Sequence, residues 1–236
     1  MTTTARSASC FAAAFLLCLG TAAFANDTAN LTTQAKRLDT AAHTDGTAAV
    51  SGRLVDTFSE FAGSTDNARA LIIGLRDGSA ITLTETQPDG SVVTTTFTPA
   101  TGKMGYGNVF ISVALAQQTL TAQGISSPTP AQIEAALNGG SVTVGNPPTT
   151  ATLTGVLTLR ASGEGWGKVA QSLGVKLGPV LSSIRSANAR LHADAMRPAQ
   201  TSKARVGHST RMDRVERPMR PERPERPERP ERPSRG

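Results

Sequence analysis

A three-residue repeat toward the end of the sequence most strongly limits what this chain can fold into. Pro-Glu-Arg occurs four times in succession over residues 221–232, after two degenerate copies. Each proline removes a backbone donor and biases the preceding residue away from the helical region. Polyproline II, a threefold helix rising about 3.1 Å per residue, fits this period and forms a stiff spacer with arginine along one edge and glutamate along another. We therefore predict a disordered or polyproline II tail over residues 196–236.

The tail also carries the net charge of the chain. The sequence has 24 Lys and Arg against 18 Asp and Glu, a net charge of +6, and residues 196–236 hold twelve of the basic and six of the acidic residues. The preceding residues therefore sum to zero, and attraction to anionic lipid or polymer is expected in the tail. The alternative is that the tail only keeps a neutral domain soluble. The candidate binding residues of the tail are Arg223, Arg226, Arg229 and Arg232.

The first 25 residues have the three parts of a secretory signal peptide. Arg6 is their only charged residue, an apolar stretch covers residues 10–20, and Ala23-Phe24-Ala25 fits the small-x-small cleavage rule. The apolar stretch is shorter than the roughly 20 residues that a membrane-spanning helix needs. We expect cleavage after Ala25, export to the periplasm or outside the cell, and no transmembrane segment in the mature chain.

The residue types that usually carry catalysis or bind metals are sparse. Both cysteines, Cys10 and Cys18, lie in the leader, so the mature chain could form no disulfide, thiolate nucleophile or cysteine-ligated zinc site. The three histidines have no partner at metal-ligand spacing, and no G-x-S-x-G motif is present. No catalytic residue, metal or cofactor is therefore predicted, and a protein without enzymatic activity is favoured.

The segment between leader and tail has the length of one domain. Residues 26–46 are polar and are expected to form a mobile lead-in. Residues 47–195 are expected to fold as an α+β domain. An antiparallel β-meander would cover residues 47–100, and a helical subdomain punctuated by glycine would cover residues 105–195.

The expected meander rests on β-branched segments and turn signals. Asp77-Gly78 and Asp89-Gly90 are both typical of tight hairpin turns. The four expected strands lie within residues 48–58, 70–75, 80–85 and 91–98.

Helical patterns follow the meander. Asn108 and Gly124 bound the first expected helix, and Thr129 begins a second through a capping box with Pro130 at its first position. Residues 141–152 are polar and are expected to be a crossover. Three further helices are expected within residues 153–163, 165–174 and 178–193.

Residues 165–190 resemble a helix-turn-helix unit. Ala170, Gly174 and Val180 occupy the positions of its small residue, turn glycine and corner apolar residue. The helix after the turn carries Arg185 and Arg190, which could contact phosphates or bases. The neutral body and the leader argue against DNA, because nonspecific affinity comes from neutralising phosphates. We predict a compact helical corner and keep a nucleic-acid binder as an alternative.

Three stretches together resemble secreted proteobacterial proteins of unknown function: MGYGNV at residues 104–109, PTPAQIEAALNGG at 128–140 and RASGEGWGKVAQSLG at 160–174. The resemblance implies a shared fold and export, but no reaction and no functional residue. Tyr106 and Trp166, the only tyrosine and the only tryptophan, are selected as candidate ligand contacts. Glu164 beside Trp166 motivates a second alternative, a small secreted hydrolase.

These observations favour an exported binding or structural protein of the cell envelope. Its tail is expected to contact an anionic polymer or lipid there.

Overall fold

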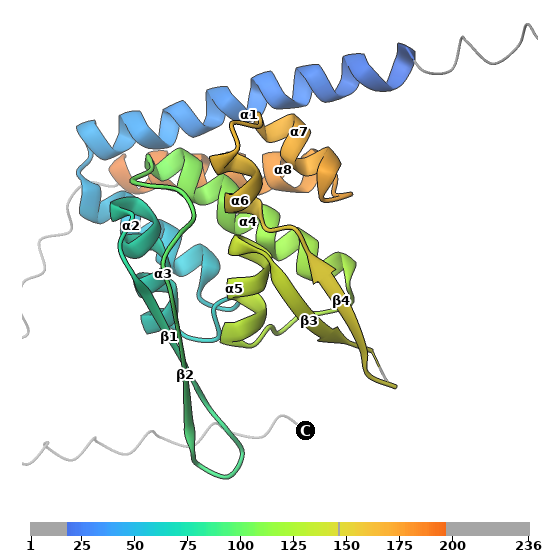
Figure 1. Ribbon diagram of the computed structural model, residues 1–236. Coiled ribbons are helices and arrows are strands. Elements are labelled where there is room, and N and C mark those ends of the chain that lie inside the picture. The colour runs from blue at the N-terminus through green and yellow to red at the C-terminus, as the bar shows by residue number, and fades with distance from the viewer. Residues whose placement is uncertain (1–17, 146, 197–236) are drawn as a thin grey trace, which may run out of the picture. The chain divides into compact units, whose positions relative to one another are not determined.

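The computed structural model describes residues 18–145 and 147–196, with side chains from residue 26 onward. Within these ranges the chain forms eight helices and four strands, an α+β fold as predicted (Figure 1). None of the helices in the described part of the chain is long and apolar enough to cross a membrane. The predicted tail conformation and most of the leader lie outside the described residues.

The expectation of a mobile lead-in is wrong, because residues 26–44 belong to helix α1 (Cys18–Thr44). The buried side chains of this helix are spaced by three and four residues, which places them on one face. They are Leu31, Ala35, Leu38 and Ala42. Threonine, asparagine and charged residues separate them, so the apolar stripe is narrow and the segment is polar on average.

Two of the predicted strands are helices, α2 (Thr47–Phe58) and α3 (Thr65–Asp77). Ser64 caps α3 by accepting a hydrogen bond of 3.1 Å from the backbone N–H of Asn67. Gly78 ends the helix in the left-handed conformation, at φ 68°. The dipeptide Asp77-Gly78 is thus a helix C-cap and not a hairpin turn, because both structures need a residue that tolerates positive φ.

The other two predicted strands are confirmed as a hairpin. β1 (Ile81–Thr86) pairs antiparallel with β2 (Val92–Phe97), with Ile81 opposite Phe97. The turn contains Asp89-Gly90, as predicted. Both the hydroxyl and the backbone N–H of Ser91 donate to the carboxylate of Asp89. These two hydrogen bonds, first the one from the hydroxyl and second the one from the N–H, lower the pKa of that carboxyl below its ordinary value.

The expected crossover at residues 141–152 is a second hairpin. β3 (Gly140–Val144) pairs antiparallel with β4 (Thr149–Leu153). The predicted four-stranded meander is therefore replaced by two separate two-stranded sheets, which project from the helical part of the fold (Figure 1).

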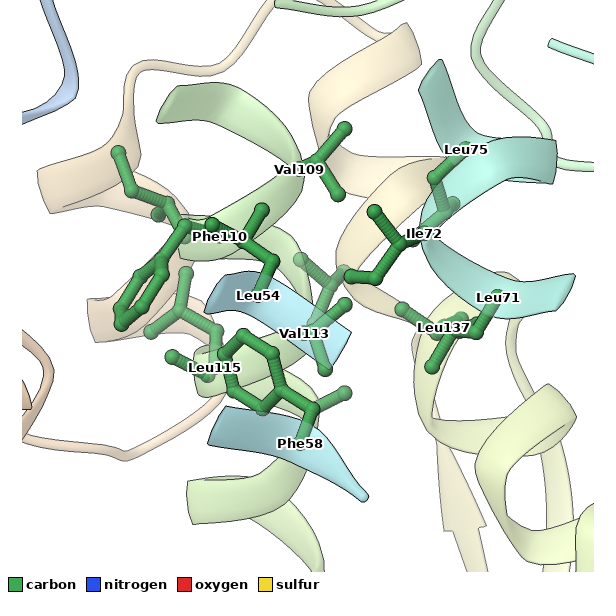
Figure 2. Packing of buried hydrophobic residues seen from close by; sticks show 14 of the residues in the cluster. Leu54, Phe58, Leu71, Ile72, Leu75, Val109, Phe110, Val113, Leu115 and Leu137 are labelled. Atoms are coloured by element: carbon green, nitrogen blue, oxygen red, sulfur yellow. The ribbon is translucent and has the colours of Figure 1, made fainter. Parts of the chain in front are cut away.

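The core surrounds helix α4 (Tyr106–Ala122). This helix contacts α1, α2, α3, α5 and α8, and its side chains from Val109 to Ala116 are all buried. A helix apolar on every side belongs in the interior of a fold. Phe110 of α4 packs on Phe58 of α2 with ring centroids 5.0 Å apart, and Figure 2 shows side chains of α3 closing the same cluster.

The remaining helices agree with the sequence-based predictions. α5 (Pro130–Asn138) begins with the predicted capping box, in which the Thr129 hydroxyl and the Gln132 side chain each accept from the other residue's backbone N–H. Three helices separated by glycine follow: α6 (Val156–Ala161), α7 (Trp166–Ser172) and α8 (Leu177–Ala195).

Candidate functional site

Trp166 and Tyr106 are buried at the starts of two helices. Trp166, the first residue of α7, is 6% exposed, and its indole N–H donates to Oδ1 of Asn108 at 3.2 Å. Tyr106, the first residue of α4, is 8% exposed. Arginines cover both rings: the guanidinium of Arg76 lies 5.2 Å from the centre of the Tyr106 ring, and that of Arg160 lies 5.0 Å from the Trp166 ring. Both aromatic residues therefore pack inside the fold.

Helix α1 packs closely against the glycines beside these rings. A β-carbon at Gly107 would collide with the backbone of Ala35, and one at Gly167 would lie 2.5 Å from the hydroxyl of Thr28. Asp39 of α1 also accepts a hydrogen bond of 3.1 Å from the backbone N–H of Gly107. The two glycine-rich stretches thus allow α1 to approach α4 and α7 closely.

A cavity of about 480 Å³ lies beside the loop before α4. Its lining comprises Thr101, Gly102, Lys103, Met104, Gly105, Asn108, Arg160 and Gly163. The hydrolase alternative requires a pocket that gathers Tyr106 and Glu164, and neither residue lines this cavity. Instead, the backbone carbonyl of Glu164 accepts from Arg160 at 2.6 Å, and its carboxylate lies 3.4 Å from the hydroxyl of Ser172.

The helix-turn-helix-like segment forms a packed corner between α7 and α8. Ala170 and Val180 are buried, Gly174 has φ 68°, and the N–H of Val175 donates to the carbonyl of Ala170 at 3.0 Å. Arg185 and Arg190 are both exposed on α8. They are five residues apart and therefore lie about 140° from each other around the helix axis. They do not form a single surface that could contact DNA.

A groove of about 710 Å³ lies between α1 and α8. Figure 1 shows the two helices lying against each other. We call this feature the α1–α8 groove. Its lining residues are Gln34, Arg37, Thr40, Ala41, Thr44, Asp45, Arg185, Asn188, Ala189, Leu191 and His192.

The α1–α8 groove combines positive charge with amide groups. Arg37 comes from α1 and Arg185 from α8, and Asp45 is the single carboxylate in the lining. The side-chain amide of Asn188 donates to the backbone carbonyl of Gln34 at 3.1 Å and to its side-chain oxygen at 2.9 Å. These bonds fix the spacing of the two helices at the groove.

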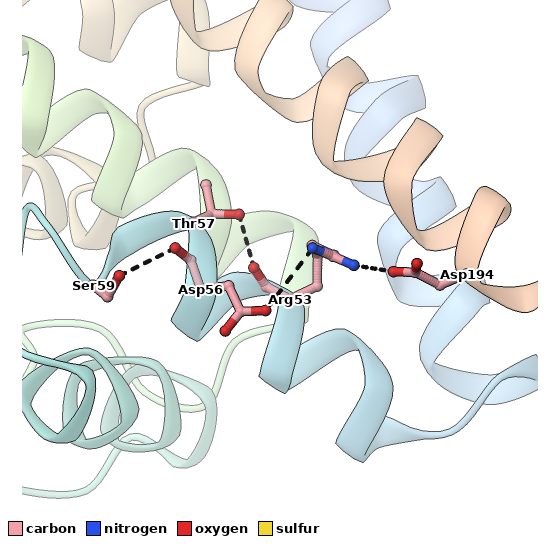
Figure 3. A network of polar contacts seen from close by, with 5 residues as sticks. All are labelled: Arg53, Asp56, Thr57, Ser59 and Asp194. Atoms are coloured by element: carbon pink, nitrogen blue, oxygen red, sulfur yellow. Dashed lines mark hydrogen bonds and ion pairs between the residues drawn. The ribbon is translucent and has the colours of Figure 1, made fainter. Parts of the chain in front are cut away.

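A third cavity, of about 370 Å³, lies at the C-terminal end of α8 and includes Arg53. Figure 3 shows Arg53 of α2 between Asp56, whose carboxylate lies 3.9 Å away, and Asp194 of α8. This ion pair ties α2 to α8. We interpret this arrangement as structural, since the guanidinium of Arg53 is paired with carboxylates of the chain itself.

Arg185 was predicted from the sequence as a candidate contact, whereas Arg37 was not, because residues 26–46 were expected to be a mobile lead-in. The spacing of Gln34, Arg37, Ala41 and Thr44 was the available signal, since these positions fall on one helix face. The tail arginines, Arg223, Arg226, Arg229 and Arg232, lie outside the described residues.

Among the described side chains, no group of three or more His, Cys, Asp or Glu is placed to hold a metal ion. Comparison with protein-family models, with curated proteins and with solved structures finds no match for this chain.

Proposed function

We propose that the protein is an exported, non-enzymatic binding protein of the cell envelope that contacts an anionic component there. The observation that carries this proposal is the α1–α8 groove, where Arg37 and Arg185 line one cavity from two different helices. The basic tail provides a second region of contact.

The chemistry of the groove suits an anion with several oxygens. A guanidinium presents a planar fork of donors that matches carboxylate, sulfate or phosphate, and such charge-assisted hydrogen bonds are stronger than neutral ones. A volume of about 710 Å³ lies within the range of roughly 300–1,000 Å³ usual for ligand sites. Ala41 and Ala189 add small apolar surfaces to the lining.

The position of the first buried side chain is compatible with cleavage after Ala25. Leu31 is the first buried residue among the described side chains of α1, and residues 26–30 are exposed or half-buried. Cleavage at the predicted site would therefore leave Leu31, Ala35, Leu38 and Ala42 in place.

The test measures retention of the purified protein on two anionic surfaces, an immobilised polyuronate such as alginate and vesicles of phosphatidylglycerol. The variants are Arg37→Ala, Arg185→Ala and a deletion of residues 211–236. Arg190→Ala is the matched control, since it removes an exposed arginine of the same helix that does not line the groove. We expect each groove variant to weaken binding to one of the two surfaces by roughly tenfold, because a hydrogen bond to a charged group contributes about 1.5–3 kcal/mol.

The control should bind like the parent protein, and the tail deletion should weaken binding to both surfaces. Unchanged binding in both groove variants would contradict a role for the groove. Equal loss in Arg185→Ala and Arg190→Ala, together with steeply salt-dependent binding to duplex DNA, would instead support the nucleic-acid alternative.

A further inference from the structure

The β1–β2 hairpin has one edge closed at Thr84 and one edge that is open along Val92–Thr96, just beyond which the Asn138 amide of α5 bonds Thr98 and Ala100. On the β1 side, the side-chain amide of Asn67 donates to the backbone carbonyl of Thr84 at 2.8 Å and accepts from its N–H at 2.9 Å. This carboxamide takes the place of a neighbouring strand. Because the backbone groups of Thr84 point toward Asn67, they point away from β2.

The hydrogen-bonding direction of every other residue in the hairpin follows from this. Inward and outward residues alternate along an antiparallel pair. Thr84 lies opposite Thr94, so Thr94 also points outward, and Val92 and Thr96 share its direction. The inward bond from the N–H of Gln87 to the carbonyl of Ser91, at 2.8 Å, agrees with this alternation. Within the described residues, no hydrogen bond to the outward backbone groups of these three β2 residues is found.

The open edge also lacks the features that usually protect an edge strand. Residues 91–98 include no charged residue and no proline, and β2 pairs with β1 without a bulge. Lysine, proline and bulges are the usual means of preventing association through an edge. Val92 is 62% exposed and Val93 is 46% exposed, so apolar surface accompanies the free backbone groups.

We propose that β2 is a self-association surface on which β2 of a second copy of this chain adds as an antiparallel strand. A two-fold axis through Thr94 would pair Thr94 with its own counterpart and Val92 with Thr96 of the second copy. The three outward residues would then exchange six backbone hydrogen bonds, and the two hairpins would form one four-stranded sheet. Val93 would lie beside Thr95 of the second copy, which covers its exposed side chain.

A second copy is a suitable partner because the strand carries no charge. Two copies in this register bring no like charges together, and the β-branched residues of both strands suit a pleated surface. This inference does not depend on the proposed function, since the α1–α8 groove contributes nothing to it.

The test uses the full chain with Cys10→Ser and Cys18→Ser, which leaves no other cysteine. Thr94→Cys is then treated with a short bis-maleimide cross-linker, and the products are separated by mass. The matched control is Thr86→Cys, on the same face of the hairpin but on β1. In the proposed sheet the two copies of residue 86 lie three strand spacings apart across the sheet and four residues apart along it, a separation of about 20 Å, whereas the two copies of residue 94 are about 5.5 Å apart.

We expect cross-linked dimers with Thr94→Cys and almost none with Thr86→Cys. In the parent protein, sedimentation should show a concentration-dependent dimer. Thr94→Pro should raise its dissociation constant by at least about tenfold, because both hydrogen bonds between the paired Thr94 residues lose their donor. Thr86→Pro, which removes an outward N–H from β1, should leave the dimer intact. A protein that is monomeric at all concentrations, or equal cross-linking at the two positions, would overturn the proposal.

Discussion

At the scale of single residues, Gly107 is the position where α4 meets the backbone of α1. In the interior of an ordinary helix, alanine is more favourable than glycine by about 1 kcal/mol. Here the added methyl group would enter the space held by Ala35, so the helices would have to separate. We therefore expect Gly107→Ala to lower the free energy of unfolding by roughly 1–3 kcal/mol, the usual cost of overpacking, as measured by urea denaturation.

Gly52→Ala is the control for this substitution. Gly52 is an exposed residue within α2, and a β-carbon there would meet nothing within 4 Å. Helix propensity then acts alone, and we expect this variant to be as stable as the parent or more stable by up to about 1 kcal/mol. If both variants gained stability, α1 would not lie against Gly107 in solution.

At the scale of elements, Asn67 connects α3 to the loop before it and to the first hairpin. It is 5% exposed, and its amide nitrogen donates to the carbonyls of Ala62 and Thr84. Asn67→Ala would leave the backbone groups of Thr84 facing an apolar side chain. We expect a loss of roughly 1–3 kcal/mol in unfolding free energy, the cost of leaving a buried polar group without a partner.

Asn138→Ala is the matched comparison. The Asn138 amide makes the same kind of paired contact, with the carbonyl of Thr98 at 2.8 Å and the N–H of Ala100 at 3.1 Å. Asn138 is half-exposed, so water can replace its bonds, and the loss should be smaller. Equal losses in the two variants would show that burial of Asn67 does not determine its contribution.

The elements that were predicted correctly from the sequence are determined by residues close together in the chain. The hairpin at Asp89-Gly90 and the capping box at Thr129 each depend on residues within a few positions of one another. Asp77-Gly78 was misinterpreted because a hairpin turn and a helix C-cap make the same demand on glycine. Helix α1 was missed because its apolar stripe is narrow and polar residues dominate the segment.

Only part of the candidate site could be predicted, because the groove depends on residues that are distant in sequence. Arg185 was selected from the helix-turn-helix resemblance, and the structure places it in the lining of the α1–α8 groove together with Arg37 of α1. Tyr106 and Trp166 were selected as rare aromatic residues, and both are buried beneath arginines. Sequence alone identifies residue types that bind anions, but the groove depends on contact between segments about 150 positions apart.

At the scale of the whole molecule, α1 holds together parts of the chain that are distant in sequence. It contacts α2, α4, α7 and α8. Three glycines in the glycine-rich stretches beside Tyr106 and Trp166 leave room for its close approach: Gly105, Gly107 and Gly167. Residues 18–25, the end of the predicted leader, belong to the same helix as residues 26–44. The predicted cleavage site after Ala25 lies within α1 and ahead of Leu31, the first buried residue among the described side chains of this helix.

We predict that a chain beginning at residue 26 unfolds cooperatively and that a chain beginning at residue 45 does not. The chain from residue 26 keeps Leu31 and Leu38, so its thermal midpoint and cooperative unfolding should match those of the full chain. The chain from residue 45 loses these leucines, each contributing about 1.5–3 kcal/mol of burial, and exposes the surfaces of α4 and α8 that they cover. This loss is comparable with the roughly 5–15 kcal/mol that stabilises a typical domain. Calorimetry should therefore show no cooperative transition for the shorter chain, and a transition like that of the parent would mean that α1 is dispensable.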